Sequence, residues 1–129
     1  WRANKLLKKV YGVNKLPYVF KYKKYVDQRC QDTFPDYKRF PCVTPSWDNS
    51  SRRDNKSYFA LHNSTPKLFK KWIEAYLKKF TPYSKSENLF FINAWNEWAE
   101  GNYLEPDKKW GYAYLEAVKE AFSKIKKQN

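Results

Sequence analysis

Two glutamates, Glu97 and Glu100, stand three residues apart in the stretch of this sequence that is richest in reactive and aromatic side chains. In an extended strand, residues at this spacing point to opposite faces, whereas in a turn they share one face. Gly101 follows directly and the apolar pattern of residues 89–92 has ended, so we expect a turn here. The pKa values of two carboxyl groups on one side of a pocket can be shifted apart, so that one is a neutral acid and the other an ionised base.

Chemistry at glycosidic bonds needs such a pair, with carboxyl groups about 5–10 Å apart. Trp47, Trp95 and Trp98 are candidates to stack on a sugar ring and to raise the pKa of a nearby acid. The alternative is an ordinary ion pair at the rim of the fold, in which one or both glutamates contact Arg52, Arg53 or a lysine. The spacing of the glutamates is compatible with both interpretations, so catalysis and ion pairing stay open at this point.

A second polar loop, residues 46–53, follows a short apolar segment at residues 40–45. The loop contains an indole, a carboxylate, a carboxamide and a guanidinium, which belong to Trp47, Asp48, Asn49 and Arg52. This repeats the pattern of the glutamate stretch, because an apolar strand again ends in side chains that can bind a substrate. The alternative is a surface turn, since Asp, Asn and Ser are good turn formers.

The sequence has no pattern for a metal or a nucleotide cofactor. His62 is the single histidine, and no HxH or HExxH spacing supports a zinc site. No GxGxxG or GKS phosphate loop occurs, and no Asp-x-Asp pair of the kind that many metal-dependent glycosyltransferases use. We therefore expect neither a metal nor a cofactor. Cys30 and Cys42 are too few for a disulfide framework and indicate reduced thiols in a cytoplasmic protein.

A formal net charge of +13 favours anionic partners, such as nucleic acids, anionic glycans or membrane surfaces. The lysines, however, are spread along the chain as pairs such as Lys70-Lys71 and Lys78-Lys79, which is typical of the solvated faces of helices. No nucleic-acid motif is present, so we expect no nucleic-acid partner. The charge leaves peripheral association with the anionic inner face of a membrane open. No run of about 18 apolar residues occurs that would predict a transmembrane helix.

Strands and helices are expected to alternate along the chain, which predicts an α/β protein with a parallel sheet and crossover helices. The clearest helix begins at Thr65 and Pro66, an N-cap followed by proline, and its apolar stripe continues to Phe80. The unbroken apolar run at 89–92 indicates a strand that is buried on both faces. The other expected elements are the end of a helix at 4–11, a strand at 16–20, a helix at 22–31, a loop at 32–38, a strand at 40–45, and a last helix at 111–127 with Leu115, Val118, Phe122 and Ile125 on one face.

The segment Phe91–Asp107, followed by Trp110–Tyr112 and Tyr114-Leu115, resembles the C-terminal signature of WbsX-like proteins. These proteins are also described as glycoside hydrolase family 99-like domains, and they come from bacterial surface-polysaccharide clusters. The earlier segment Pro45–Asn49, with Arg52-Arg53, is similar to a second motif of the same family, in the expected order. The resemblance covers roughly residues 40–120.

The resemblance implies a (β/α)8 TIM-type barrel, of which this chain is the C-terminal part. A complete barrel needs about 250 residues, whereas this chain has 129 and starts at Trp1 rather than Met. We therefore expect residues 1–129 to form a single partial domain that lacks the N-terminal part of the barrel. Such a piece is expected to be unstable or inactive alone.

The related endo-α-mannosidases carry an Asn-Glu-Trp-His-Glu-Gly motif, whose first glutamate acts as a base on the substrate 2-hydroxyl and whose second is the general acid. By resemblance, Glu97 is the base, Glu100 is the acid, and Glu105 matches a further acidic position. Ala99 stands where those enzymes have His, so their mannosidase specificity does not carry over. The residues expected to bind sugar or to position the acids are Trp47, Asp48, Asn49, Arg52, Trp95, Asn96, Trp98 and Glu105.

Together these features predict a carbohydrate-active enzyme, of glycosyltransferase or glycoside hydrolase type. It is expected to act on glycosidic bonds in lipopolysaccharide, O-antigen or capsular polysaccharide biosynthesis, with a glycan or a lipid-linked oligosaccharide as substrate. The alternative is a non-catalytic glycan-binding or scaffold domain that uses the same rim for recognition only. The sugar, the linkage, the choice between transfer and hydrolysis, and the oligomeric state stay open.

Overall fold

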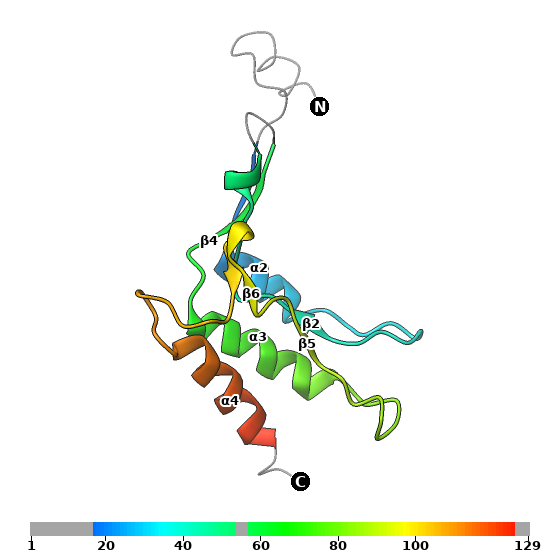
Figure 1. Cartoon of the computed structure of the whole chain (residues 1–129). Helices are drawn as coiled ribbons and strands as arrows, with labels where there is room; N and C mark the ends of the chain where they lie inside the picture. The colour runs from blue at the N-terminus through cyan, green and yellow to red at the C-terminus, as the bar shows by residue number, and fades with distance from the viewer. Residues whose placement is uncertain (1–16, 54–56, 126–129) are drawn as a thin grey trace, which may run out of the picture.

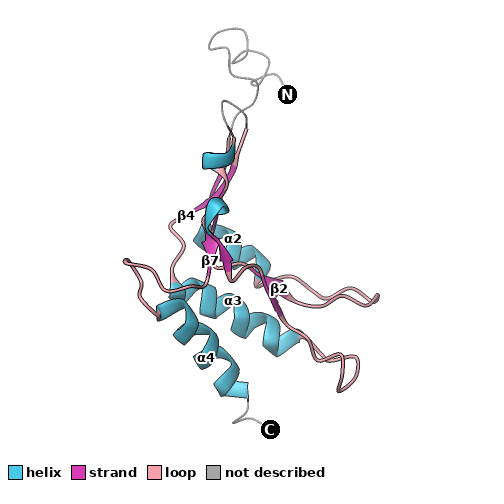
Figure 2. Ribbon diagram, in the orientation of Figure 1, coloured by secondary structure: helices cyan, strands magenta, loops and turns pink. Residues whose placement is uncertain are grey.

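The computed structural model describes residues 17–53 and 57–125, so the helix end expected at 4–11 lies outside the described residues. Strands and helices alternate as predicted (Figure 1). Figure 2 shows that the strands are short compared with the loops that join them. In chain order the elements are β1 (Tyr18–Lys21), α2 (Tyr22–Arg29), β2 (Cys42–Val43), β3 (Trp47–Asp48), η1 (Ser50–Arg52), β4 (Phe59–His62), α3 (Pro66–Lys79), β5 (Phe91–Ile92), β6 (Asn96–Glu97), η2 (Trp98–Glu100), β7 (Asn102–Tyr103) and α4 (Ala113–Ile125).

Helix α3 contacts α2, α4 and β2, and its sequence explains both its start and its buried face. The Thr65 side chain accepts a hydrogen bond from the backbone N–H of Leu68 at 3.3 Å, and Pro66 occupies the first turn. The predicted helix start is therefore confirmed. The side chains that the helix buries recur at helical spacing, as the apolar stripe predicts, and they are Phe69, Trp72, Ile73 and Tyr76.

Helix α4 forms within the range predicted for the last helix. Its most buried side chains are Tyr114, Ala117 and Ala121. On the apolar face identified in the sequence, Leu115 and Val118 are partly buried against the core and Phe122 is exposed. Small side chains on the buried face let α4 approach α3 closely, and the Tyr114 ring lies 5.7 Å from that of Phe69. The larger residues of α4 therefore lie at the flanks of the contact.

Two pairs of strands run parallel, as predicted. β1 pairs with β4 over the register Tyr18–Phe59 to Lys21–His62, and β2 pairs with β5 through Cys42–Phe91 and Val43–Ile92. Helix α2 lies in the connection of the first pair and α3 in that of the second, so each pair has the crossover connection that parallel strands require. The two pairs belong to separate sheets, β1-β4-β3 and β2-β5. The closed barrel remains a prediction.

Strands β3 and β4 are not predicted by the sequence pattern. β3 runs antiparallel to β4, with Trp47 opposite Leu61 and Asp48 opposite Ala60. β4 also pairs with β1, so it is the central strand of its sheet. The pairing of β4 with β1 joins segments distant in the chain, and β3 has only two residues, too few for a periodic pattern.

The strand expected to be buried on both faces is shorter and more exposed than predicted. β5 contains only Phe91 and Ile92, and Phe91 is 50% exposed. Leu89, just before it, is also exposed. The prediction of burial on both faces is therefore wrong for this chain. The exposed residues are the alternate ones, because Phe90 and Ile92 pack against the core while Leu89 and Phe91 point to the opposite face.

The core gathers around α2, α3 and α4, and it includes one buried hydroxyl. Tyr22 is fully buried at the start of α2, and its hydroxyl donates to the backbone carbonyl of Thr44 at 2.7 Å. Burial raises the pKa of the Tyr22 phenol far above its usual range. Among the helices of residues 17–53 and 57–125, none is long and apolar enough to cross a membrane.

Candidate functional site

The two glutamates lie on a short hairpin formed by β6, the 3-10 turn η2 and β7. Asn96 pairs with Tyr103 and Glu97 with Asn102, in antiparallel register. The chain thus leaves its extended path between Glu97 and Glu100, and the turn predicted from the loss of apolar patterning is confirmed. Gly101 closes the turn with φ of 54°, a left-handed conformation that suits glycine.

The hairpin packs against the second polar loop, which comes from a distant part of the sequence. Ser51 donates its hydroxyl to the carbonyl of Ala99 at 3.0 Å, and Ser46 donates to the carbonyl of Gly101 at 2.5 Å. A Cβ at Gly101 would lie 3.3 Å from the Cβ of Asp48, so the two loops are in close contact there. The two stretches that the sequence marks as functional therefore form one surface region.

Arg52 contacts both glutamates. Its Nη1 lies 3.7 Å from Oε1 of Glu97 and 3.3 Å from Oε1 of Glu100. From these two distances the two Oε1 atoms are at most about 7 Å apart, which is compatible with the separation of roughly 5–10 Å used in glycoside chemistry. The side chains of Arg52, Glu97 and Glu100 are 54%, 43% and 21% exposed. The same three groups thus fit both interpretations that the sequence left open, an ion pair with Arg52 and a catalytic pair of carboxylates.

The exposed ion pairs do not explain why these groups are gathered. A salt bridge in such a setting contributes roughly 0–1 kcal/mol, because water screens the charges and the side chains lose freedom. The cluster is therefore a weak source of stability.

Trp98 is held in place on one face and at its N–H group. Its ring stacks on that of Tyr103, with centroids 3.6 Å apart and planes inclined by 14°. Its indole N–H donates to Oε2 of Glu105. Trp95 is also exposed, while its backbone carbonyl accepts from the N–H groups of Leu104 and Glu105. Two indoles thus remain available at the surface of the hairpin region.

Two predicted site residues, Trp47 and Asn49, hold the second loop in place. Trp47 is partly buried against the core. Asn49 is 8% exposed, and its side-chain oxygen accepts from the backbone N–H of Phe59 at 2.9 Å, which ties the loop to β4. Asp48 accepts from the backbone N–H of Ser50 at 2.9 Å, as the turn alternative predicted. The structure therefore gathers Arg52, Glu97 and Glu100 into one cluster, with the side chains of Trp47 and Asn49 turned toward the scaffold.

Several residues that hold this region together were not predicted as site residues from the sequence. Asn102 is fully buried beneath the hairpin, and Thr44 donates its hydroxyl to the Asn102 side-chain oxygen at 2.7 Å. Tyr103 donates its hydroxyl to Asp107 at 3.0 Å. Burial and this bond raise the pKa of Tyr103 to about 12. Asn102, Tyr103 and Asp107 belong to the family signature, which could have marked them as important. Their roles, however, depend on long-range packing.

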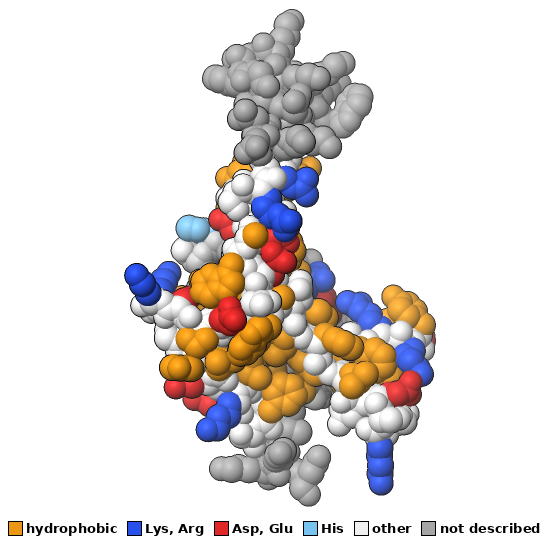
Figure 3. All heavy atoms as spheres, viewed as in Figure 1, with side chains coloured by type: hydrophobic (Ala, Val, Ile, Leu, Met, Phe, Trp, Pro, Cys, Tyr) orange, Lys and Arg blue, Asp and Glu red, His pale blue; other side chains and the backbone are white. Residues whose placement is uncertain are grey.

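The described residues contain no group of three or more His, Cys, Asp or Glu side chains that could hold a metal ion. His62 lies at the end of β4 and belongs to no such group in the described chain. Figure 3 shows hydrophobic side chains gathered on one face of the molecule, and the exposed hydrophobic residues include Phe91, Trp95 and Trp98.

Exposed indoles beside two carboxylates and a guanidinium are typical of sites that bind sugars. The model of the family described as Glycosyltransferase WbsX matches residues 2–118, so this chain belongs to that family. The resemblance found in the sequence is confirmed. The match also extends to residue 2, well before the segment that the motifs had marked.

The relatives found are proteins that carry no assigned activity in their names. The uncharacterized protein WxcX of Xanthomonas campestris pv. campestris strain B100 is 37% identical over 107 residues, which cover 82% of this chain and 15% of the relative. The WxcX protein of strain ATCC 33913 is 41% identical over 90 residues, which cover 69% of this chain and 13% of the relative. The chain thus spans about 15% of the length of these relatives. No solved structure matches this chain.

Proposed function

We propose that this chain contributes the acid–base residues of a carbohydrate-active enzyme that acts on glycosidic bonds during surface-polysaccharide biosynthesis. The products to be built are lipopolysaccharide, O-antigen or capsular polysaccharide, and the substrate is a glycan or a lipid-linked oligosaccharide. The observation that carries the proposal is the placement of Glu97 and Glu100 around one guanidinium, beside exposed indoles, in a chain of the WbsX family.

The two glutamates have separate roles in this proposal. Glu97 accepts the proton of the sugar 2-hydroxyl while the 2-oxygen bonds to the anomeric carbon, and Glu100 donates a proton to the oxygen of the leaving group as the glycosidic C–O bond breaks. Water or a sugar hydroxyl then attacks the anomeric carbon and gives its proton to Glu100, while the bond to the 2-oxygen breaks and Glu97 returns its proton to that oxygen. These roles follow the order of the acids in the related motif. Positioned acid and base groups of this kind contribute typically about 10²–10⁴-fold to a rate. The same pair serves hydrolysis or transfer, since either water or a sugar hydroxyl can attack.

Arg52 and the indoles position the substrate. Arg52 holds both carboxylates in the free protein and can donate to sugar hydroxyls once substrate enters. Trp95 and Trp98 offer exposed ring faces for a sugar, and Glu105 fixes the orientation of Trp98 through its indole N–H. Asn96 lies exposed in β6, next to the reacting pair.

The test is turnover of the native glycan by the whole protein with Glu97→Gln or Glu100→Gln. Each change removes a proton-transfer group and preserves size, so we expect turnover to fall by at least about 100-fold. Glu116→Gln is the matched control, because Glu116 is an exposed glutamate of α4 outside the cluster, and it should leave turnover unchanged. Wild-type turnover in either of the first two variants would overturn the proposal.

A second candidate is a non-catalytic glycan-binding or scaffold domain. It is favoured by the fact that Arg52 already pairs with both carboxylates, as it would in a recognition surface. Isothermal titration decides between the two candidates. Unchanged glycan binding in the double Gln variant, together with no turnover by the parent protein, would support recognition without catalysis.

We also propose a cytoplasmic location at the inner face of the membrane. Cys30 and Cys42 are free thiols, which suits a reducing compartment. Burial raises the pKa of both thiols, so they are not activated nucleophiles. A lipid-linked substrate and the net charge of +13 both fit peripheral contact with an anionic membrane surface.

A further inference from the structure

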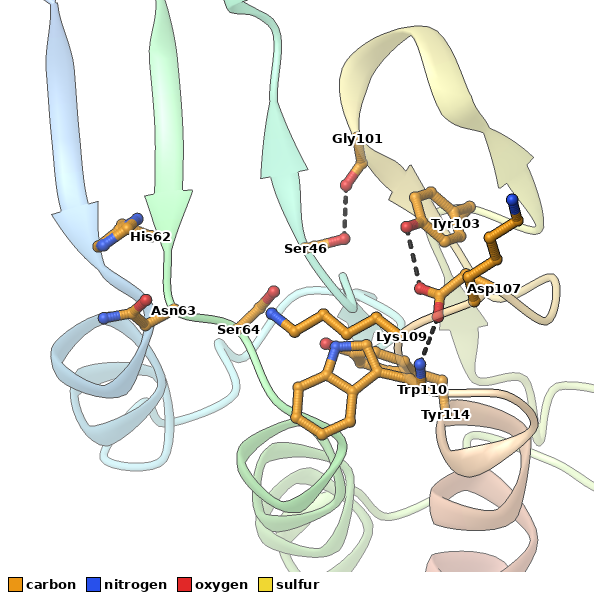
Figure 4. Close-up of a pocket in the computed structure, with 11 residues that line it drawn as sticks. Ser46, His62, Asn63, Ser64, Gly101, Tyr103, Asp107, Lys109, Trp110 and Tyr114 are labelled. Atoms are coloured by element: carbon orange, nitrogen blue, oxygen red, sulfur yellow. Dashed lines mark hydrogen bonds between the residues drawn. The ribbon is translucent and has the colours of Figure 1, made fainter.

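A polar pocket lies at the base of the β6–β7 hairpin, on the side toward α4. Its volume is about 460 Å³. The lining comes from the segment before β3, the turn after β4, the hairpin, the loop before α4 and the first turns of α4 (Figure 4). Part of the lining belongs to the family signature, but no role was assigned to these residues from the sequence, and the proposed acid–base chemistry does not use the pocket.

One wall of the pocket is fixed by Asp107. Its carboxylate accepts from the Tyr103 hydroxyl at 3.0 Å and from the backbone N–H of Trp110. Its backbone carbonyl accepts from the N–H of Gly111 at 2.9 Å. Asp107 is the only carboxylate in the described lining, and these fixed donors hold it in the wall. Its single negative charge stands against the two positive charges of Lys108 and Lys109, which also line the pocket.

Two lysines, Lys108 and Lys109, stand at this wall without a carboxylate partner. Neither forms an ion pair with any residue of the described chain, whereas Lys23, Lys38 and Lys70 do. Nζ of Lys109 lies 5.1 Å from the centroid of the Trp110 ring. Figure 4 shows the Lys109 chain extending over this indole toward Ser64. Both charges are therefore available to a ligand.

The opposite wall supplies neutral donors. His62, Asn63 and Ser64 follow one another at the end of β4 and line the pocket. Asn63 has φ of 60°, so the chain turns there, and Figure 4 shows Ser64 directed toward Lys109, with His62 and Asn63 on the other side of the turn. Imidazole, amide and hydroxyl groups donate hydrogen bonds to oxyanions. The pocket thus combines the two lysines with neutral donors, of which the Ser64 hydroxyl faces Lys109.

We propose that this pocket binds an anionic group of the glycan, a sugar carboxylate or a phosphate. Charge-assisted hydrogen bonds from ammonium groups to oxyanions are among the strong ones in proteins, which gives the pocket selectivity for acidic over neutral sugars. The inference rests on the proposed function, because it assigns the substrate of the same hairpin to the class of acidic glycans. Carboxylate and phosphate share this chemistry, and the experiment separates them.

The experiment is isothermal titration of the whole protein with three probes: trigalacturonate, glucose 1-phosphate and neutral maltotriose. We expect at least one anionic probe to bind, and Lys108→Gln with Lys109→Gln to weaken that binding by roughly tenfold or more. Binding of trigalacturonate identifies a carboxylate, and binding of glucose 1-phosphate identifies a phosphate. The control is Lys67→Gln with Lys119→Gln, two exposed lysines outside the pocket, which changes the net charge equally and should alter affinity by less than about twofold.

The inference is overturned if both double variants weaken binding equally, since net charge alone would then explain it. It is also overturned if maltotriose binds as tightly as the anionic probes, or if no anionic probe binds. Circular dichroism and thermal melting confirm that each variant is folded. Turnover of the native glycan by Glu100→Gln reports separately on the proposed function, so the failure of one proposal is distinguishable from the failure of the other.

Discussion

Arg52 reaches both glutamates because two loops distant in the sequence meet at small residues. The contact is closest at Gly101, which faces Asp48, and hydroxyls of Ser46 and Ser51 join the loops on either side. Side chains larger than these would separate the guanidinium from the carboxylates. The geometry of the pair therefore depends on residues that carry no charge.

Gly101→Ala tests this dependence against a control within the same chain. Gly101 and Gly111 have nearly the same left-handed conformation, with φ of 54° and 53°. A Cβ at Gly101 meets Asp48 at 3.3 Å, whereas one at Gly111 meets nothing within 4 Å. We expect both Ala variants to lose about 1–2 kcal/mol of unfolding free energy from the backbone conformation, with a larger loss for Gly101→Ala. Chemical denaturation measures the difference, and equal losses would contradict the close contact.

For single residues, the sequence indicated which side chains have suitable chemistry, but it did not show which of them reach the site. It marked Glu97, Glu100 and Arg52, and these three lie together. It also marked Trp47 and Asn49 as sugar-binding residues, yet their side chains contact the core and the β4 backbone. An indole or a carboxamide serves a scaffold as well as a ligand, so residue type alone does not decide between the two uses.

At the scale of elements, the helices followed from the sequence and several strands did not. Helix α3 has its N-cap, its proline and its apolar stripe within one short segment, so local information suffices. Strands β3 and β4 are short, and β4 also pairs with β1, which lies far from it in the chain. In α4 the most buried residues include Ala117 and Ala121, which the apolar face found in the sequence does not contain.

The N-cap of α3 is expected to stabilise the helix. Thr65→Ala removes the acceptor for the Leu68 N–H and should lower the unfolding free energy by about 1 kcal/mol. Thr65→Ser keeps the hydroxyl and should restore most of that stability. Thermal or denaturant unfolding of the two variants measures both values. Equal stability of Thr65→Ala and the parent would show that the cap is not a determinant of the helix.

For the molecule as a whole, the chain exposes apolar surface of the kind that usually packs against other elements. The four residues of β1 are all exposed, Phe91 of β5 is half-exposed, and β5 has one open edge. The relatives extend well beyond the matched segment. We propose that further strands of a (β/α)8 barrel cover these surfaces in the whole protein. The sequence alone predicted this only through its resemblance to a family, since a partial domain has no periodicity that reveals what it packs against.

Paired measurements on Glu100→Gln are the sharpest test of proton transfer by Glu97 and Glu100 at a glycosidic bond. Binding and turnover of the native glycan are measured on the same preparation of the whole protein. We expect affinity within about threefold of the parent and turnover lower by at least about 100-fold, since the amide keeps the shape of the acid but cannot donate its proton. Turnover equal to that of the parent would contradict this proton transfer.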